Sequence, residues 1–268
     1  MLFPRRFAAA LTVSMLWLST PALAASCSDT GGKYEAWKSE FAPEARAAGV
    51  GERGLAALMG SSYSKATISA DRNQKSFKYS LDKFLQVRGA EVIVKQGRSR
   101  KAKNAQMMAA IEAKYGVPAG VIIAIHGMET GFGSFMGDTN VVSAIATLAY
   151  DCRRTEFFTP HLVAALKLVD QGVITTKSVG AKHGELGHTQ FLPGNALAFG
   201  VDGNGDGKID LTNMADALSS TANFLRQKGW KPGAGFQEGE PNFAVIKEWN
   251  AATVYQQAIA IMGKRIDG

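Results

Sequence analysis

The residue best placed to do chemistry in this sequence is Glu129, which follows a long apolar run. Ile125 precedes it by one helical turn and Ile122 by two, so its carboxyl group belongs to the apolar stripe of a buried helix. Burial and the partial negative charge of a helix C-terminus both raise the pKa of a carboxyl group. A carboxylic acid that keeps its proton near pH 7 is suited to general acid catalysis.

Two glycines follow this glutamate, at Gly131 and Gly133. They end the predicted helix and remove two side chains, so we expect that a bulky substrate can approach the carboxyl group. The alternative is a last-turn glutamate that points to water, as most glutamates do.

The elements that must position Glu129 are mainly helices. Gly116 and Pro118 predict the end of one helix and the start of the next, which runs from Val117 to Glu129. Apolar residues at three- and four-residue spacing predict further helices over 34–48, 51–59, 77–94, 101–115, 141–150, 154–169, 214–228 and 254–265. Strand signals are few, over 173–176 and around 202–212. We expect a mainly α protein with a small β element.

The composition is that of a globular protein with a sizeable core. Of 268 residues, 46% are hydrophobic and 20% are charged, which excludes a disordered or low-complexity chain. The net charge is only +7, and the one dense basic run is 95–103. We expect no nucleic acid partner. That run is either a solvated helix face or an attraction for an anionic polymer such as a cell wall.

The N-terminus has the pattern of an export signal. Arg5 and Arg6 precede an apolar stretch over 7–18, and an A-x-A cleavage site follows at 22–24. We therefore predict a signal peptide over 1–24 and a single domain over 25–268. The stretch is too short for the alternative, an uncleaved membrane anchor.

The two cysteines, Cys27 and Cys152, agree with export, because an even number in an oxidising compartment favours a disulfide. The alternative is a lipid-anchored N-terminus at Cys27. The leucine that such an anchor requires lies one place too early, at Leu23.

The segment around Glu129 and five further segments resemble those of a known family. The run 125–137 resembles the catalytic segment of the membrane-bound lytic transglycosylase B family, which cleaves peptidoglycan. Segments that agree in order and spacing are 150–154, 184–193, 202–216, 222–230 and 242–250. The resemblance covers nearly all of 33–268 and implies a lysozyme-like α fold with an EF-hand-like loop.

The resemblance implies that Glu129 is both the catalytic acid and the catalytic base. It would protonate the β-1,4 glycosidic oxygen between N-acetylmuramic acid and N-acetylglucosamine, and the muramic acid's C6 hydroxyl would attack, forming a 1,6-anhydro end. Ordinary glycosidases use two carboxylates, but a tethered internal nucleophile can work with one. For the nearest other acids, Asp138 and Glu185, we expect capping or structural roles. The alternatives are a hydrolytic muramidase on the same fold and a non-catalytic wall-binding protein.

Four residues are expected to line the sugar cleft by resemblance. The resemblance places Gln190 beside the acid, and its side chain can both donate and accept hydrogen bonds to a sugar. It also places Trp249 and Asn250 in the cleft, where an indole can stack on a pyranose ring or simply pack. Phe224 stands where a tyrosine is expected, which removes one hydroxyl from the substrate site.

Arg153 and Arg154 could bind the carboxylates of the stem peptide, because a guanidinium group matches a carboxylate. The alternative is a pair of surface arginines in the first turn of a helix. His126 and His188 have no recognised metal-ligand spacing, and we expect His126 either to support the site from behind or to be a core residue.

The loop 202–210 has a calcium-loop pattern, with oxygen side chains at its first, third and fifth positions and a glycine at the sixth. Its twelfth position is Asn213 where a glutamate is expected. The predicted donors are Asp202, Asn204, Asp206, the Lys208 carbonyl and Asp216. Calcium would be structural, because the chemistry needs no cofactor. The alternative is a metal-free turn.

The predicted partner is the glycan strand of peptidoglycan. We expect a periplasmic monomer that acts alone or beside other cell-wall enzymes.

Overall fold

The computed structural model describes residues 25–73 and 79–268. The predicted signal peptide, 1–24, and the first residues of the predicted helix 77–94 lie outside the described residues.

The described chain is mainly helical, as predicted, and its only named strands have two residues each. In chain order its elements are η1 (Gly31–Lys33), α1 (Tyr34–Ala47), α2 (Glu52–Met59), α3 (Lys65–Arg72), α4 (Leu81–Arg88), α5 (Ala90–Lys103), α6 (Ala105–Tyr115), α7 (Ala119–Thr130), β1 (Thr139–Asn140), α8 (Val141–Tyr150), α9 (Thr155–Gln171), β2 (Val179–Gly180), α10 (Pro193–Phe199), α11 (Met214–Gln227), α12 (Phe243–Trp249) and α13 (Thr253–Asp267).

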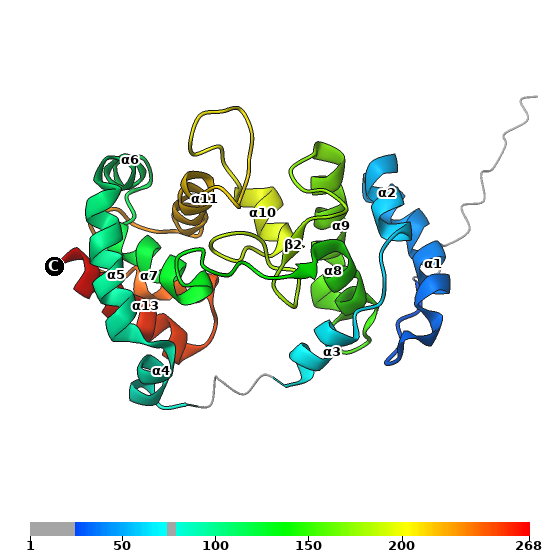
Figure 1. Cartoon of the computed structure of the whole chain (residues 1–268), viewed down its shortest axis with the longest axis horizontal. Coiled ribbons are helices and arrows are strands. Elements are labelled where there is room, and N and C mark those ends of the chain that lie inside the picture. Colours follow the sequence, from blue (N-terminus) through cyan, green and yellow to red (C-terminus); the bar gives the residue numbers. More distant parts are fainter. Residues whose placement is uncertain (1–24, 74–78) are drawn as a thin grey trace, which may run out of the picture.

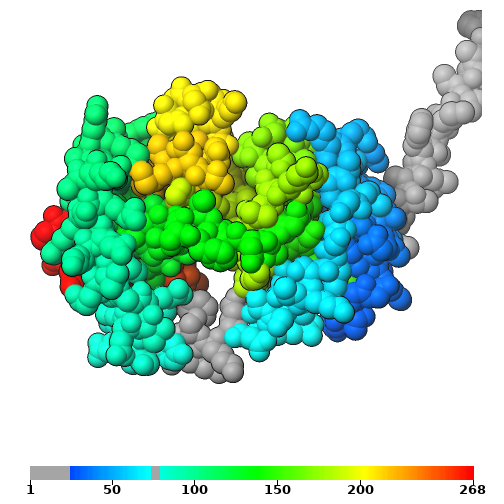
Figure 2. Space-filling model, viewed as in Figure 1, coloured from blue at the N-terminus to red at the C-terminus, as the bar shows by residue number. Residues whose placement is uncertain are grey.

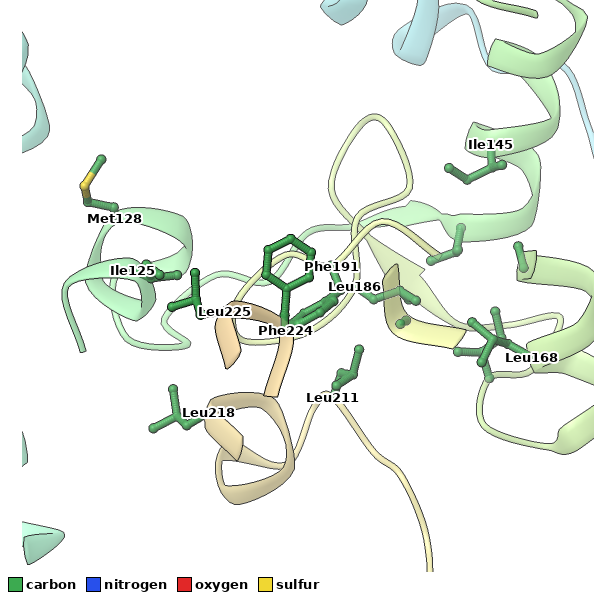
Figure 3. Close-up of a cluster of buried hydrophobic side chains, with 14 of the residues drawn as sticks. Ile125, Met128, Ile145, Leu168, Leu186, Phe191, Leu211, Leu218, Phe224 and Leu225 are labelled. Atoms are coloured by element: carbon green, nitrogen blue, oxygen red, sulfur yellow. The ribbon is translucent and has the colours of Figure 1, made fainter. Parts of the chain in front are cut away.

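The helices form two groups with a connecting region between them. Figure 1 shows α4, α5, α6, α7 and α13 at one end of the molecule and α1, α2, α3, α8 and α9 at the other, with α10 and α11 between. Helix α7 packs against α13, α5, α11 and α6, whereas α9 packs against α8, α10 and α2. One cluster of buried side chains runs through both groups, and Figure 3 shows Phe191 and Phe224 between Ile125 on α7 and Ile145 on α8.

Helix α7 is the central helix of its group. Its sequence is apolar on every side, and all of its residues are buried except Glu129, which is partly exposed. Pro118 precedes its first residue, and Gly131 ends it in the left-handed conformation at φ 57°. The predicted buried helix with one carboxyl group near its C-terminus is therefore confirmed.

Several predicted boundaries are wrong. The predicted helix 77–94 is broken at Gly89, which has φ 67° and separates α4 from α5. Helix α5 then continues to Lys103, so the predicted helix 101–115 begins only at Ala105. The amphipathic pattern runs on through both breaks, which is why spacing alone did not show them.

The predicted strands are also misplaced. Residues 173–176 and 202–212 form turns and loops, and the observed sheet pairs Thr139 with Gly180 and Asn140 with Val179, antiparallel. Strands of two residues are too short for an alternating pattern to reveal.

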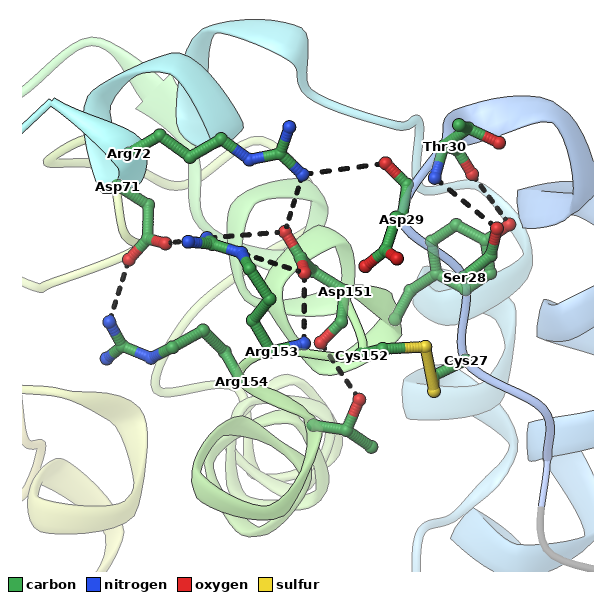
Figure 4. Close-up of polar contacts among 12 residues, drawn as sticks. Cys27, Ser28, Asp29, Thr30, Asp71, Arg72, Asp151, Cys152, Arg153 and Arg154 are labelled. Atoms are coloured by element: carbon green, nitrogen blue, oxygen red, sulfur yellow. Dashed lines mark hydrogen bonds and ion pairs between the residues drawn. A yellow bond between two sulfur atoms is a disulfide. The ribbon is translucent and has the colours of Figure 1, made fainter.

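The predicted disulfide between Cys27 and Cys152 is present, with 4.9 Å between the two Cα atoms (Figure 4). It ties the start of the described chain to the residues just before α9. A sulfur atom in a disulfide cannot carry a lipid, so in this form Cys27 is not a lipid anchor. Among the described residues no single helix combines the length and apolar character needed to cross a membrane, and α6 with α7 does so only as a pair bent by 112°.

Candidate active site

Glu129 is held by two hydrogen bonds to the same carboxylate oxygen. The Tyr255 hydroxyl donates to Oε1 at 2.6 Å, and the Trp249 indole N–H donates to it at 3.0 Å. Tyr255 comes from α13 and Trp249 from the end of α12, so the site joins three helices. With Oε1 occupied, Oε2 is the oxygen available to a ligand.

Burial raises the pKa of Glu129 above its usual value. The hydrogen bonds from Tyr255 and Trp249, and the positive charge of Arg88, lower the pKa, whereas the negative charge of Glu185 raises it; burial prevails. Arg88 lies over the Tyr255 ring, 5.7 Å from its centre. The raised pKa that the sequence predicted for this glutamate therefore agrees with its surroundings.

Glu129 lies in the wall of a cavity of about 370 Å³. This cavity brings together segments that are up to 121 residues apart in the chain, and five predicted site residues are among those that line it. The lining residues are Glu129, Ala181, Glu185, Gln190, Phe191, Leu192, Asn195, Phe224, Trp249 and Asn250.

The aromatic residues of the cavity form a packed cluster. The Trp249 ring meets Phe191 edge to face at 5.2 Å and Phe224 at 5.4 Å between ring centres. Phe224 is only 1% exposed, so it packs in the core and shows the cavity little more than its edge. Trp249 thus has a contact that the sequence did not predict: its N–H binds the candidate acid.

Gln190 and Asn250 each bind backbone groups of the protein with one end of the side-chain amide. Gln190 has φ 56°, and its Nε2 donates to the carbonyls of Gly187 at 2.7 Å and Met136 at 3.3 Å. Asn250 Oδ1 accepts from the N–H of Ala252 at 3.0 Å. Both residues line the cavity, so the Gln190 oxygen and the Asn250 amide nitrogen are the groups they can offer a ligand.

Arg153 and Arg154 are not among the residues that line this cavity. Both guanidinium groups pair with Asp71 at the end of α3, Arg154 at 2.8 Å, and Arg153 also reaches Asp151 at 3.4 Å (Figure 4). Their positive charge is therefore already neutralised within the protein. This pairing favours the structural alternative, and binding of a stem peptide by these arginines stays a prediction.

The two glycines after Glu129 end the helix as expected, but neither is among the residues that line the cavity. Gly131 and Gly133 have φ of 57° and 81°, which favour glycine, and a side chain on Gly133 would collide with the His188 ring. His188 in turn lies 3.0 Å from the buried His126, between its Nδ1 and the Nε2 of His126. The glycines thus serve the turn and this histidine pair, and His126 is a core residue as expected.

Tyr255 is a site residue that the sequence analysis missed. It lies in the last predicted helix, over 254–265, where the apolar spacing indicates burial only. Nothing in the local sequence indicated that its hydroxyl meets a glutamate 126 positions away.

The sequence profile described as Transglycosylase SLT domain matches residues 33–239 of this chain. The chain belongs to this transglycosylase SLT domain family. The family resemblance seen in the sequence is confirmed by this match.

A relative of this SLT-domain chain agrees with that assignment. It is 37% identical over 121 residues to membrane-bound lytic murein transglycosylase B of Escherichia coli (strain K12), an alignment that covers 44% of this chain and 34% of that protein. The match thus spans about a third of that relative's length.

Solved protein structures from two bacteria resemble the fold of this chain. SltB3 from Pseudomonas aeruginosa, solved in complex with NAG-anhNAM-pentapeptide, superposes with a TM-score of 0.80 at 28% identity over 89% of this chain and 80% of that one. Slt35 of Escherichia coli, solved in complex with calcium, gives a TM-score of 0.73 at 21% identity over 94% of this chain and 98% of that one. The predicted fold class is therefore confirmed.

The predicted calcium loop of this SLT-domain chain is closed by its own hydrogen bonds. Figure 2 shows the region as a yellow projection at one edge of the molecule. Asp216 is fully buried, and its carboxylate accepts from the backbone N–H groups of Gly203 at 2.9 Å, Asn204 at 3.2 Å and Asp210 at 2.8 Å.

The remaining loop oxygens are also used within the loop. Asp202 accepts from the N–H groups of Gly205, Asp206 and Gly207, and Asp206 accepts from Lys208. Asn213 caps α11 by accepting from Ala215. In the parts of the chain that are described, no group of three or more His, Cys, Asp or Glu side chains gathers around a metal position. The oxygen donors are of the type that suits calcium, and binding of calcium by this loop stays a prediction.

Proposed function

We propose that this protein is an exported lytic transglycosylase that cleaves the β-1,4 bond between N-acetylmuramic acid and N-acetylglucosamine in peptidoglycan, leaving 1,6-anhydro ends. The observation that carries the proposal is Glu129: it is the one partly exposed residue of α7, it lines a cavity, and two donors hold it. Family membership supports the same reaction.

In the first half of the reaction, Glu129 acts as the acid. Burial raises the pKa of the carboxyl group, which favours its protonated form, and Tyr255 and Trp249 occupy Oε1, so the proton that is transferred belongs on Oε2. Transfer of this proton to the glycosidic oxygen lets the bond from that oxygen to C1 of the muramic acid break. Positive charge then develops at C1 and the ring oxygen.

In the second half, Glu129 acts as the base. The C6 hydroxyl of the same muramic acid forms a bond to C1 and gives its proton to the Glu129 carboxylate. During this interval the carboxylate is ionised, and the Tyr255 and Trp249 donors stabilise its charge. No water is consumed, and Glu129 ends in its starting state.

The cavity offers groups suited to an amino sugar. Gln190, Asn250 and Asn195 provide amide groups among the aromatic side chains. SltB3, the structural relative at 28% identity, has been solved with NAG-NAM-pentapeptide and with NAG-anhNAM-pentapeptide. This supports a peptidoglycan strand as the ligand of the cavity.

Export to the periplasm is part of the proposal. Its support is the disulfide between Cys27 and Cys152, which is stable in an oxidising compartment, together with the signal-like N-terminal sequence. We propose that the protein acts there as a monomer on peptidoglycan.

The test is digestion of purified sacculi by the wild type and by Glu129→Gln, followed by mass analysis of the products. Anhydro ends are one water lighter than hydrolysed ends. We expect turnover to fall by about 10²–10⁴-fold in Glu129→Gln, because the proton donor is lost. Glu156→Gln, on the exposed face of α9, is the matched control and should keep wild-type activity.

The outcomes separate the alternatives. Hydrolysed ends alone would assign a muramidase. Wild-type turnover in the Glu129→Gln variant would remove Glu129 from the chemistry. Wall binding without turnover in the wild type would assign a binding protein.

A further inference from the structure

A second carboxylate lines the same cavity as Glu129. Glu185 lies in the loop between β2 and α10, and its side chain is 23% exposed. Its charge is close enough to raise the pKa of Glu129. The two carboxyl groups thus share one cavity but come from different elements.

Glu185 is held by a histidine. The backbone N–H of His183 donates to Glu185 Oε2 at 3.1 Å, and the His183 Nδ1 atom lies 3.4 Å from Oε1. The other nitrogen of the ring, Nε2, lies 3.8 Å from Asp71 Oδ1. The imidazole therefore lies between two carboxylates, one of which is in the cavity wall.

Asp71 is anchored in turn. Its side chain is 1% exposed, and a carboxylate buried to that extent needs charged partners, which Arg153 and Arg154 supply. The ion pairs between the end of α3 and the turn before α9 thus connect through His183 to Glu185.

The two carboxyl groups differ in their surroundings. Glu129 is buried at the end of an apolar helix, and this burial raises its pKa in spite of the two uncharged donors that bind it. Glu185 accepts a hydrogen bond from a backbone N–H and lies 3.4 Å from an imidazole nitrogen, so its carboxyl group is held by polar neighbours in the cavity wall. Glycoside hydrolysis uses two carboxyl groups in one cleft, one in an apolar and one in a polar environment.

We propose that Glu185 is a further catalytic residue, the general base of a hydrolytic reaction that accompanies the anhydro-forming one, with His183 and Asp71 as its positioning residues. This inference rests on the proposed function of Glu129. It adds water as a second nucleophile, so that the enzyme releases both hydrolysed and anhydro ends.

Hydrolysis would use both carboxyl groups and one water molecule. The oxygen of a water molecule forms a bond to C1 of the muramic acid while the bond from C1 to the glycosidic oxygen breaks. Glu129 gives its proton to the leaving oxygen, and Glu185 takes one proton from the water. The two carboxyl groups then exchange a proton with solvent to return to their starting states.

The experiment measures the ratio of hydrolysed to anhydro ends after digestion of purified sacculi. The wild type should give both. In Glu185→Gln the ratio should fall at least tenfold, because a neutral amide cannot accept the water proton, while anhydro ends still form. His183→Asn should lower the same ratio by a smaller factor, since the base is still present but less well held.

The control is Glu238→Gln, which changes an exposed glutamate that binds Gln257 and does not line the cavity, so the ratio should stay unchanged. Melting curves confirm that the variants are folded. A wild type that yields anhydro ends only, or an unchanged ratio in Glu185→Gln, would overturn this inference and leave the role of Glu129 intact. Absence of any cleavage by the wild type would instead refute the proposed function.

Discussion

The hydroxyl of Tyr255 on α13 lies 2.6 Å from Oε1 of Glu129 on α7, and it is the shorter of the two hydrogen bonds to that carboxyl group. Burial and the nearby charge of Glu129 raise the pKa of Tyr255 well above its usual value, so the hydroxyl stays a donor. The contact therefore favours the ionised glutamate over the protonated one, in opposition to burial.

Replacing this tyrosine should change the pH dependence of the reaction. Activity requires a protonated Glu129 and is lost as the pH rises through its pKa. In Tyr255→Phe the bond that lowers this pKa is missing, so the pKa rises and the alkaline limb of kcat/KM moves to higher pH. We expect kcat to fall by about tenfold, because a hydrogen bond to the carboxylate is lost. Rates measured across the pH range test both effects.

Trp249→Phe is the matched comparison, because it removes the other donor to Oε1. The Trp249 hydrogen bond lowers the pKa of Glu129 less than the Tyr255 hydrogen bond does. The alkaline limb of kcat/KM in Trp249→Phe should therefore also move to higher pH, but by less than in Tyr255→Phe. A limb that stays in place in Tyr255→Phe would contradict this account of how the pKa is set.

The sequence predicted the acid of this site but not what holds it. Glu129 was identifiable because its apolar helix and its position near a glycine C-cap are local features. Tyr255 was not, because its place in an amphipathic helix indicates burial only; the packing of α13 on α7 brings its hydroxyl to the acid. Arg153 and Arg154 show the same limit, since Asp71 lies 82 and 83 positions away.

The fold was predictable to a similar extent. Helix α9, which ends at Gly172, was placed within two residues at both ends. The short helices α3 and α12 and the two-residue strands were missed, because they are too short for a periodic pattern to develop. Helix boundaries inside a continuous amphipathic run, as at Gly89, depend on how the two halves pack.

Removing the disulfide should lower stability and spare activity. Cys27 and Cys152 are 125 residues apart, and the bond restricts the unfolded chain across that length. We expect Cys27→Ser with Cys152→Ser to lose about 2–5 kcal/mol in the free energy of unfolding. The melting temperature should therefore drop by roughly 5–15 °C, with turnover at 25 °C close to wild type. Thermal melts and thiol titration test this; free thiols in the untreated protein would argue against the bond.

The stability of the protein at the 202–216 loop should depend more on Asp216 than on calcium. Its carboxylate accepts three backbone N–H groups while fully buried, and an amide in its place would leave donors unpaired. Asp216→Asn should cost on the order of 2 kcal/mol and lower the melting temperature by about 5 °C. Adding calcium or a chelator should shift the melting temperature of the wild type by less than this substitution does.

Asp206→Asn is the control for the loop, because Asp206 is exposed and its loss should cost less than that of Asp216. A calcium-induced rise in the wild-type melting temperature larger than the loss in Asp216→Asn would show that the loop is a calcium site after all. Melting curves in millimolar calcium and in chelator decide between the two.

The buried pair of His126 and His188 should make the fold sensitive to acid. Burial, with the positive charges of His188 and Arg100, lowers the pKa of His126 from 6.5 to about 3, and burial likewise lowers that of His188, which Asp210 partly offsets. Between pH 6.5 and about 3 the unfolded chain therefore binds a proton at His126 that the folded chain does not. Stability is present above pH 6.5 and declines as the pH falls, by up to about 1.4 kcal/mol per pH unit for this one histidine.

Denaturant unfolding at pH 4.5 and pH 7 measures this loss. In His126→Gln the difference between the two pH values should shrink, because the glutamine can still bond to His188 but does not titrate. His161→Gln is the comparison, since burial also lowers the pKa of His161, but no second histidine adds to that effect. An equal pH dependence in the wild type and in His126→Gln would show that acid sensitivity, if present, arises from other groups.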